Sequence, residues 1–172
     1  ELKPVSVRSV ERVDAEQAWQ VVAARAGLPL AILRLSGIYG PGRNTFMNLA
    51  NGTARRLVKK DQVFNRIRVE DIASATAFLA GPKTGGIFNV TDDMPSPPQD
   101  VVTEAARLME MDAPAEQPFE TAELTPMARS FYGENKRVSN AKIKSLGFNF
   151  QYPNYMMSLA DLLSSGTWNQ RG

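Results

Sequence analysis

Hydrophobic residues near the start of the chain change from a helical spacing to an unbroken run. In residues 10–26 the apolar positions recur at helical spacing, which predicts a helix that Gly27 ends. Residues 28–35 are nearly all apolar, which is typical of a strand buried on both faces of a sheet. A helix that leads into a buried strand is the second half of a β-α-β unit, so we expect its first strand to precede Glu1.

The rest of the chain alternates between helical and extended patterns. A loop over residues 37–42 follows the first strand, at the end where open parallel sheets bind ligands, and a second strand is predicted over residues 85–90. Gly81 and Pro82 should end one helix, and Ser139 or Asn140 should cap another. We predict helices over residues 45–56, 69–79, 97 or 98 to 109, 141–146 and 154–163, an extended segment over 62–69, and a loop with at most one short helix over 111–134.

Composition limits the chemistry of the chain. Its 172 residues suffice for one domain and include no cysteine and no histidine, so proton chemistry must use Tyr, Lys, Asp, Glu or water. The net charge of +2 comes with scattered basic pairs such as Lys136 and Arg137, which we interpret as a solvated face and not as a nucleic-acid site. No apolar run approaches the ~20 residues that span a bilayer, so we expect a soluble, cytoplasmic protein with no membrane partner.

Three stretches resemble the C-terminal half of the extended, atypical short-chain dehydrogenase/reductases, the NAD-dependent epimerase/dehydratase family. Residues 34–43 (RLSGIYGPGR) are similar to the pattern R-x-x-x-x-Y-G-P, residues 65–72 (NRIRVEDI) to R-x-I-H-V-x-D, and residues 86–93 (GIFNVTDD) to G-x-x-Y-N-V. They stand in the order and spacing of the family, and the resemblance covers nearly the whole chain.

The resemblance implies the C-terminal part of a Rossmann-type NAD(P)-binding fold with a small helix-rich lobe on the substrate side. It also implies NAD or NADP as the cofactor. The family's phosphate-binding turn, G-x-x-G-x-x-G, does not occur in residues 1–172. We therefore expect residues 1–172 to be a C-terminal portion whose nucleotide-binding half is absent, and to bind a dinucleotide poorly alone.

The usual catalytic pair is replaced. In the family, the helix before the first strand carries Y-x-x-x-K with a glutamate four residues later; if Glu16 is that glutamate, the tyrosine position falls on Arg8 and the lysine position on Arg12. A guanidinium cannot exchange protons near neutral pH because its pKa exceeds ~12. No catalytic residue is therefore assigned. Arg12 is a candidate for binding the cofactor ribose, and the alternative is that both arginines are surface charges.

Other candidate site residues lie on the first strand and its loop. The backbone of Leu35, Ser36 and Gly37 matches family positions that touch the nicotinamide and the substrate, so these residues are predicted to bind the cofactor. As an alternative, Gly37 only lets the strand turn. Tyr39 either binds substrate or packs the loop, and Arg34 is predicted to be buried and paired with a carboxylate.

Two arginines in the second pattern are candidates for substrate binding. Arg66 and Arg68 alternate along an extended segment and should project to one face. Their guanidinium groups suit a phosphate or carboxylate of a substrate. The alternative is that they pair with Glu70, Asp71 or another acid on that face.

The sequence thus predicts part of an NAD(P)-dependent epimerase, dehydratase or oxidoreductase that acts on an unidentified small molecule, with nucleotide sugars as one candidate class. The alternative, favoured by Arg8 and Arg12, is a catalytically degenerate dinucleotide-sensing or scaffold protein. No metal site is predicted. Strand edges that the absent half would cover should make the chain aggregate, form a homo-oligomer or associate with that half.

Overall fold

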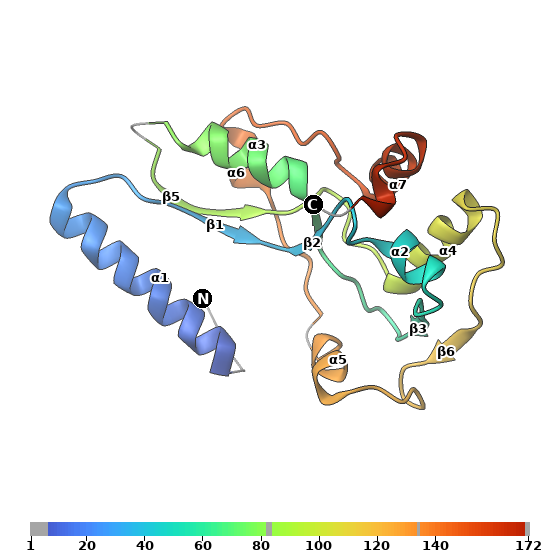
Figure 1. Cartoon of the computed structure of the whole chain (residues 1–172). Helices are drawn as coiled ribbons and strands as arrows, with labels where there is room; N and C mark the ends of the chain where they lie inside the picture. The colour runs from blue at the N-terminus through green and yellow to red at the C-terminus, as the bar shows by residue number, and fades with distance from the viewer. Residues whose placement is uncertain (1–6, 82–83, 134, 171–172) are drawn as a thin grey trace.

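Two parallel strands lie between helices at one end of the molecule. The computed structural model describes residues 7–81, 84–133 and 135–170; Pro82 and the other residues of the sequence predictions that fall outside these ranges are not described. Strands β1 (Ala31–Leu35) and β5 (Gly86–Val90) pair in parallel. Helices α3 (Val69–Leu79) and α6 (Ala141–Ser145) cover one face of the pair, and α1 (Val7–Ala26) lies on the other side (Figure 1). Helices around parallel strands confirm the predicted α/β class.

The chain changes its partner strand directly after β1. The Ser36 amide still donates to the Val90 carbonyl (3.3 Å), whereas the Gly37 amide donates to the Asn65 carbonyl (3.1 Å). Strand β2 (Gly37–Tyr39) then pairs in parallel with β4 (Arg66–Arg68). A Cβ atom at residue 37 would lie 3.1 Å from the Asn65 carbonyl oxygen, so glycine suits this crossover.

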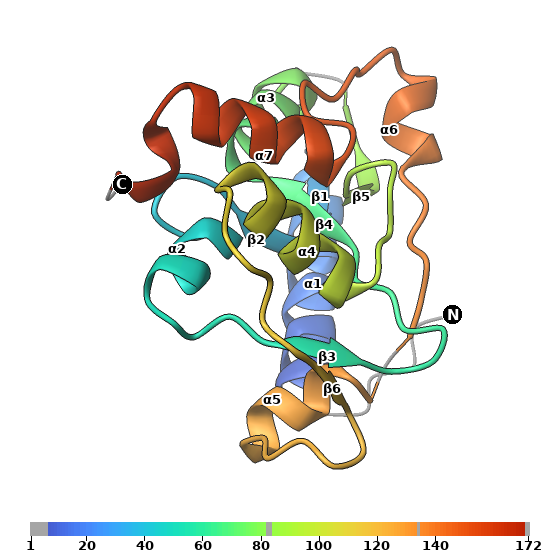
Figure 2. The same ribbon diagram turned by 90° about the vertical axis from the view of Figure 1, so that its right-hand side faces the viewer.

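A helical lobe lies beyond β2 and surrounds its own core. It comprises α2 (Thr45–Ala50), α4 (Pro98–Leu108), α7 (Tyr155–Ser164) and the short 3₁₀ helix η1 (Thr167–Asn169) (Figure 2). The side chains of Phe46, Leu159 and Leu162 fill the centre of this lobe. None of the described helices has the length and apolar character needed to cross a bilayer.

A smaller unit lies below the helical lobe in the view of Figure 2. Strands β3 (Arg56–Val58) and β6 (Glu116–Pro118) pair in parallel, and α5 (Pro126–Phe131) follows (Figure 2). Leu57, Ala122 and Tyr132 form its buried cluster. These elements and the helical lobe together are the helix-rich part that the sequence predicted.

The helix predicted over residues 45–56 is wrong beyond Ala50. Gly52 has a left-handed φ of +66°, and its amide donates to the Leu49 carbonyl (3.0 Å), which is how a helix commonly ends. Residues 51–55 form a turn and a connection instead, and residue 56, the last of the predicted helix, begins β3. Its partner β6 lies in the region predicted to be loop, and α5 is the short helix expected there.

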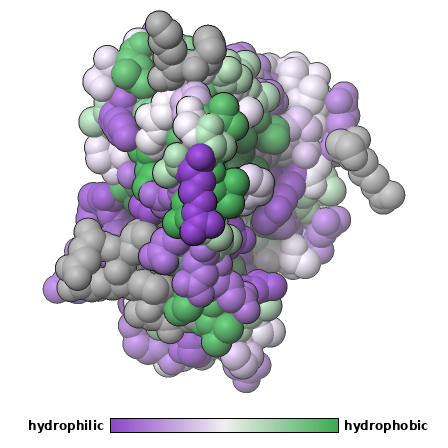
Figure 3. Space-filling model, turned by 90° about the vertical axis from the view of Figure 1, so that its left-hand side faces the viewer, coloured by the Kyte–Doolittle hydropathy of each residue, from purple (hydrophilic) through white to green (hydrophobic). Residues whose placement is uncertain are grey.

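The first strand and its helix are less buried than predicted. Ala31 and Leu33 pack on the core beneath α3, but Leu35 is 41% exposed and α1 has no buried residue. Trp19 and Val22 of α1 are 64% and 56% exposed because no described element covers their side of the helix. On the face shown in Figure 3, hydrophobic patches are separated by hydrophilic side chains.

Candidate functional site

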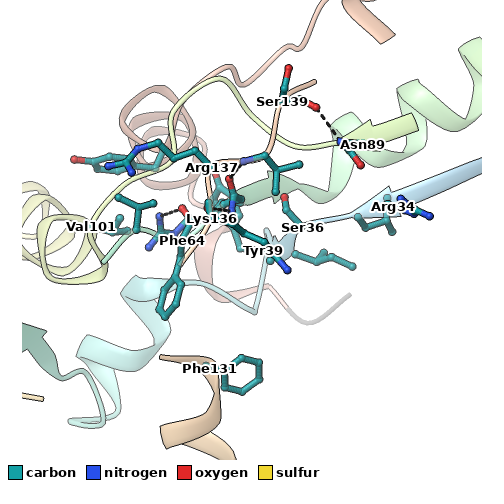
Figure 4. A pocket seen from close by; sticks show the side chains of 18 of the residues that line it. Arg34, Ser36, Tyr39, Phe64, Asn89, Val101, Phe131, Lys136, Arg137 and Ser139 are labelled. Carbon is teal, nitrogen blue, oxygen red and sulfur yellow. Dashed lines mark hydrogen bonds between the residues drawn. The ribbon is translucent and has the colours of Figure 1, made fainter. Parts of the chain in front are cut away.

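A cavity of about 880 Å³ opens where the chain crosses from β1 to β2 (Figure 4). Crossovers at the carboxyl ends of parallel strands are the usual ligand sites of open α/β sheets, and the volume suits a small molecule. The wall comes from the β1–β5 and β2–β4 pairs and their flanking residues, the helical lobe, α5 and the segment before α6. It is formed by Arg34, Leu35, Ser36, Gly37, Ile38, Tyr39, Thr45, Val63, Phe64, Asn65, Arg66, Asn89, Val101, Phe131, Lys136, Arg137, Val138, Ser139, Tyr155 and Leu159.

Most of the site residues predicted from the sequence meet at this cavity. Leu35, Ser36, Gly37, Tyr39 and Arg66 all line it, although they come from two segments about thirty residues apart. Their placement at one crossover fits the predicted binding of a cofactor and a substrate. Those roles themselves stay predictions.

Arg68 lies outside the cavity, and the structure places it with the second alternative considered for it. Its side chain is 2% exposed; Nε and Nη2 donate to the Glu70 carboxylate at 2.7 Å, and Nη1 donates to the Ser158 hydroxyl at 2.9 Å. Nη2 also reaches Asp161 (3.2 Å), and the guanidinium carbon lies 4.2 Å from the centre of the Tyr152 ring. Since every nitrogen has a partner, Arg68 joins β4 to α7 and does not reach a ligand.

Arg34 is paired with a carboxylate, as the sequence predicted. Its Nη2 lies 2.6 Å from Glu16 Oε2 and its Nε lies 2.9 Å from Oε1, a two-pronged contact between β1 and α1. Hydrogen bonding to Arg34 lowers the pKa of Glu16. Arg34 is half-buried and not fully buried, because α1 covers β1 only loosely.

The two arginines at the family's catalytic positions stand apart from the cavity. Arg8 and Arg12 are exposed on α1, and neither belongs to the cavity wall. The crossover residues and Arg12 therefore do not form one site within the described part of the chain. The predicted contact between Arg12 and a cofactor ribose stays a prediction.

Tyr39 and Arg66 of the cavity wall lie near Asp92, which is buried behind the wall. The Tyr39 hydroxyl and Asp92 Oδ2 are buried and lack a hydrogen-bond partner in the described residues. Burial raises the pKa of Tyr39 to about 12 and that of Asp92 to about 7. Burial also lowers the pKa of Arg66, which Asp92 opposes only in part. A hydroxyl, a carboxyl and a guanidinium thus lie together with little solvent to stabilise them.

The segment that closes the cavity was not predicted from the sequence. Residues 136–139, which we call the strap, cross the ends of β4 and β5. Asn65 holds the strap through two bonds of 2.8 Å, one to the Lys136 carbonyl and one from the Val138 amide. Asn89 donates to the Ser139 carbonyl at 3.0 Å (Figure 4). Lys136 and Arg137 are both exposed, in agreement with their interpretation as a solvated face, and both also line the cavity, which that interpretation did not include.

A signal for the strap was present in the sequence. Asn65 belongs to the same pattern as Arg66, and Asn89 lies in the third family-like stretch. Asparagine side chains imitate a peptide group, since each offers both an N–H donor and a carbonyl acceptor. Two asparagines at strand ends could therefore have indicated that another segment docks there.

The loop after β2 is fixed by the far end of the chain. Asn44 Nδ2 donates to the carbonyls of Gly40 and Trp168, each at 2.8 Å, and the Gly42 amide also donates to Trp168 (3.0 Å). A Cβ atom at residue 40 would lie 2.6 Å from Val69 Cγ1, so a larger residue would push the loop away from α3. The predicted ordered loop is thus held on both sides.

The strand end at the crossover is accessible from the cavity. Leu35 and Gly37 are exposed and line it. The sequence contains no glycine-rich turn to bind a pyrophosphate. No group of three or more metal-ligating side chains occurs among the residues that the structure describes.

Comparison with known proteins adds a distant curated relative. No protein-family model matches the chain. Protein YeeZ of Escherichia coli (strain K12) is 30% identical over 129 residues, which are 74% of this chain and 42% of YeeZ. The chain therefore spans less than half the length of this relative.

Solved structures define the fold more sharply. A conserved protein of unknown function from Silicibacter pomeroyi is 51% identical, with a TM-score of 0.88 over 95% of this chain and 58% of that one. A candidate NAD-dependent epimerase/dehydratase from Methylobacillus flagellatus is 30% identical, with a TM-score of 0.55 over 79% and 47%. The RMD protein of Pseudomonas aeruginosa, solved with NADPH, has a TM-score of 0.71 at 16% identity over 99% and 58%. The chain matches about half of each structure, and its fold is the C-terminal portion of the extended short-chain dehydrogenase/reductase fold, the Rossmann-type fold of the NAD-dependent epimerases and dehydratases.

Proposed function

We propose that the chain forms the substrate-side part of an NAD(P)-dependent epimerase, dehydratase or oxidoreductase that acts on a small molecule. One observation carries this proposal: the cavity lies at the crossover from β1 to β2 and includes Leu35, Ser36 and Gly37. In this fold the crossover is where a nicotinamide ring and a substrate would meet. Neighbours solved with NAD or NADPH support a nicotinamide dinucleotide as the cofactor.

The residues of this chain would mainly position the cofactor and the substrate and would contribute little acid–base chemistry. The exposed strand end at Leu35 and Gly37 would contact the nicotinamide, and Arg12 would donate hydrogen bonds to the ribose. Tyr39 and Arg66 would face the substrate in a cavity whose wall, among the described residues, contains no aspartate or glutamate. The cofactor would accept or donate hydride.

Cofactor binding tests the proposal. We expect the 172-residue chain to bind NADPH poorly and a longer chain that includes a glycine-rich turn to bind it tightly, because backbone amides of that turn hold the pyrophosphate. Fluorescence titration of NADPH against both chains measures this difference. Micromolar binding by the 172-residue chain would contradict it, and equally poor binding by both would remove the proposed cofactor.

A second candidate is a catalytically degenerate dinucleotide-sensing or scaffold protein. It is favoured by Arg8 and Arg12, which replace the usual tyrosine and lysine and lie outside the cavity. The variant Arg12→Ala in the longer chain separates the two. An enzyme that uses Arg12 for positioning should lose cofactor affinity but keep turnover at saturating cofactor, whereas a sensor shows no turnover with any substrate offered.

A further inference from the structure

The charged side chains of the cavity wall all have the same sign, which is positive. Four cationic side chains line the cavity, namely Arg34, Arg66, Lys136 and Arg137, and no aspartate or glutamate does so among the described residues. Glu16 neutralises Arg34 through its two-pronged contact. Arg66 and Arg137 form no ion pair with any described residue. The cavity therefore keeps positive charge that no carboxylate of the wall offsets.

Arg66 is held in place by backbone groups. Its Nη1 donates to the carbonyls of Phe64 (3.1 Å) and Ser96 (3.2 Å), which already pair with each other's amides. Thr91 and Asp92 fix the Arg66 carbonyl through bonds of 3.2 and 2.8 Å. Both the side chain and the backbone of Arg66 are thus fixed before any ligand arrives.

Arg137 faces the cavity from the strap. The strap is anchored on both sides of it, because Asn65 binds the backbone of Lys136 and Val138. The Arg137 side chain is exposed and forms no hydrogen bond with the described residues. An arginine on a fixed backbone with no partner of its own is suited to bind an anion, because its planar group can donate two parallel hydrogen bonds.

The remaining wall is mostly apolar. Phe64, Val101, Phe131 and Leu159 contribute carbon surface, and Phe131 is 65% exposed on α5, apart from the strap (Figure 4). The side chains of Asn65 and Asn89 bind the strap, and the other uncharged polar side chains of the wall are the hydroxyl groups of Ser36, Tyr39, Thr45, Ser139 and Tyr155. The wall suits an apolar body attached to an acidic group.

We propose that Arg66 and Arg137 together bind the phosphate or carboxylate of a small organic anion whose apolar body lies against Phe64 and Phe131. This deepens the proposed function, since it names the chemical class of the substrate. Phosphate and carboxylate share the recognition chemistry, so the experiment includes both.

Phenyl phosphate and benzoate are suitable probes, each titrated into the 172-residue chain and followed by calorimetry. We expect saturable binding of at least one probe, and the tighter probe identifies the acidic group. Arg137→Gln should weaken binding on the order of tenfold or more, because a charge-assisted hydrogen bond is lost. Arg43→Gln is the matched control: Arg43 is also exposed and lines the neighbouring cavity, so it changes the net charge equally. It should alter the affinity less than about twofold.

A second variant tests the strap without changing any charge. Asn65→Ala should also weaken binding, because it releases the backbone on both sides of Arg137, and circular dichroism verifies that the variant is folded. The proposal is overturned if neither probe binds, if Arg43→Gln weakens binding as much as Arg137→Gln, or if both cavity variants leave the affinity unchanged. None of these measurements depends on a cofactor or on turnover, so a failure of the anion proposal can be distinguished from a failure of the proposed function in the NADPH titration.

Discussion

Arg66 and Arg68 lie two residues apart on β4, yet their surroundings differ in kind. Around Arg68, two helices contribute partners, because Glu70 of α3 and Ser158 and Asp161 of α7 occupy its nitrogen atoms. Around Arg66, only backbone carbonyls accept from the side chain, and the nearby carboxyl of Asp92 is itself poorly solvated. Arg68 thus joins elements through its carboxylate partners, whereas Arg66 forms no ion pair with a described residue and is the arginine that we propose binds a ligand.

The largest expected effect comes from removing the satisfied arginine. Arg68→Gln should lower the free energy of unfolding by about 3–5 kcal/mol, because it leaves a buried polar network without its central cation. Urea unfolding followed by circular dichroism measures the change. Arg107→Gln, at an exposed arginine paired with Glu104, serves as control and should change stability by less than about 1 kcal/mol. A small loss for Arg68→Gln would show that the network contributes specificity and not stability.

The carboxyl beside Arg66 should respond to pH in the opposite sense to an ordinary aspartate. Because burial raises the pKa of Asp92 to about 7, the folded state holds this proton more tightly than the unfolded state. The stability from Asp92 is therefore complete below pH ~4 and is lost as the pH rises through about 7. Asp92→Asn should stabilise the protein on the order of 2–3 kcal/mol at pH 8 and have little effect at pH 4.

The neighbouring aspartate provides a control for this pH effect. Burial acts against ionisation of Asp93 too, but hydrogen bonds from Asn140 and Lys144 outweigh it and lower its pKa. The stability that ionised Asp93 contributes to the folded protein is present above the pKa that Asp93 has in the unfolded chain. It is lost as the pH falls through the lower pKa of the folded state. Thermal unfolding across pH should show opposite trends for Asp92→Asn and Asp93→Asn, and parallel trends would refute the difference.

A smaller effect is expected at the hydroxyl that Arg68 contacts. Ser158→Ala removes one bond of 2.9 Å to Nη1 but leaves the Ser158 carbonyl, which accepts from the same nitrogen at 3.1 Å. The free energy of unfolding should fall by about 1 kcal/mol. In a double-mutant cycle, the effect should vanish in the Arg68→Gln background; an unchanged effect would mean that Ser158 acts through packing alone.

The smallest effect on stability should come from Arg66. Arg66→Gln leaves the Phe64 and Ser96 carbonyls bonded to each other's amides, so the change should be less than about 1 kcal/mol. Chemical denaturation beside Arg68→Gln gives the direct comparison. If both variants lost equal stability, Arg66 would be a structural residue like its neighbour, and the anion proposal would lose its buried partner.

Local sequence patterns predicted most of the helices and strands well. The site was harder to predict, because it depends on contacts between segments that are distant in the sequence. The apolar run before Leu35 and the acidic start of α3 were sufficient to place a strand and a helix. Leu35, Gly37 and Arg66 were placed together only through the family resemblance. The pairing of β3 with β6 and the docking of the strap depend on partners more than fifty residues away, which periodicity cannot show.

The bond between Asn44 and Trp168 has a consequence for the order in which the protein is made. Synthesis proceeds from the N-terminus, so the loop beside the cavity emerges more than a hundred residues before the residue that fixes it. Before Trp168 is synthesised, the polar groups of the loop are hydrogen-bonded to water. Contacts between residues so far apart in the sequence also form slowly. The loop beside the cavity therefore reaches its final contacts only after residue 168 has been synthesised.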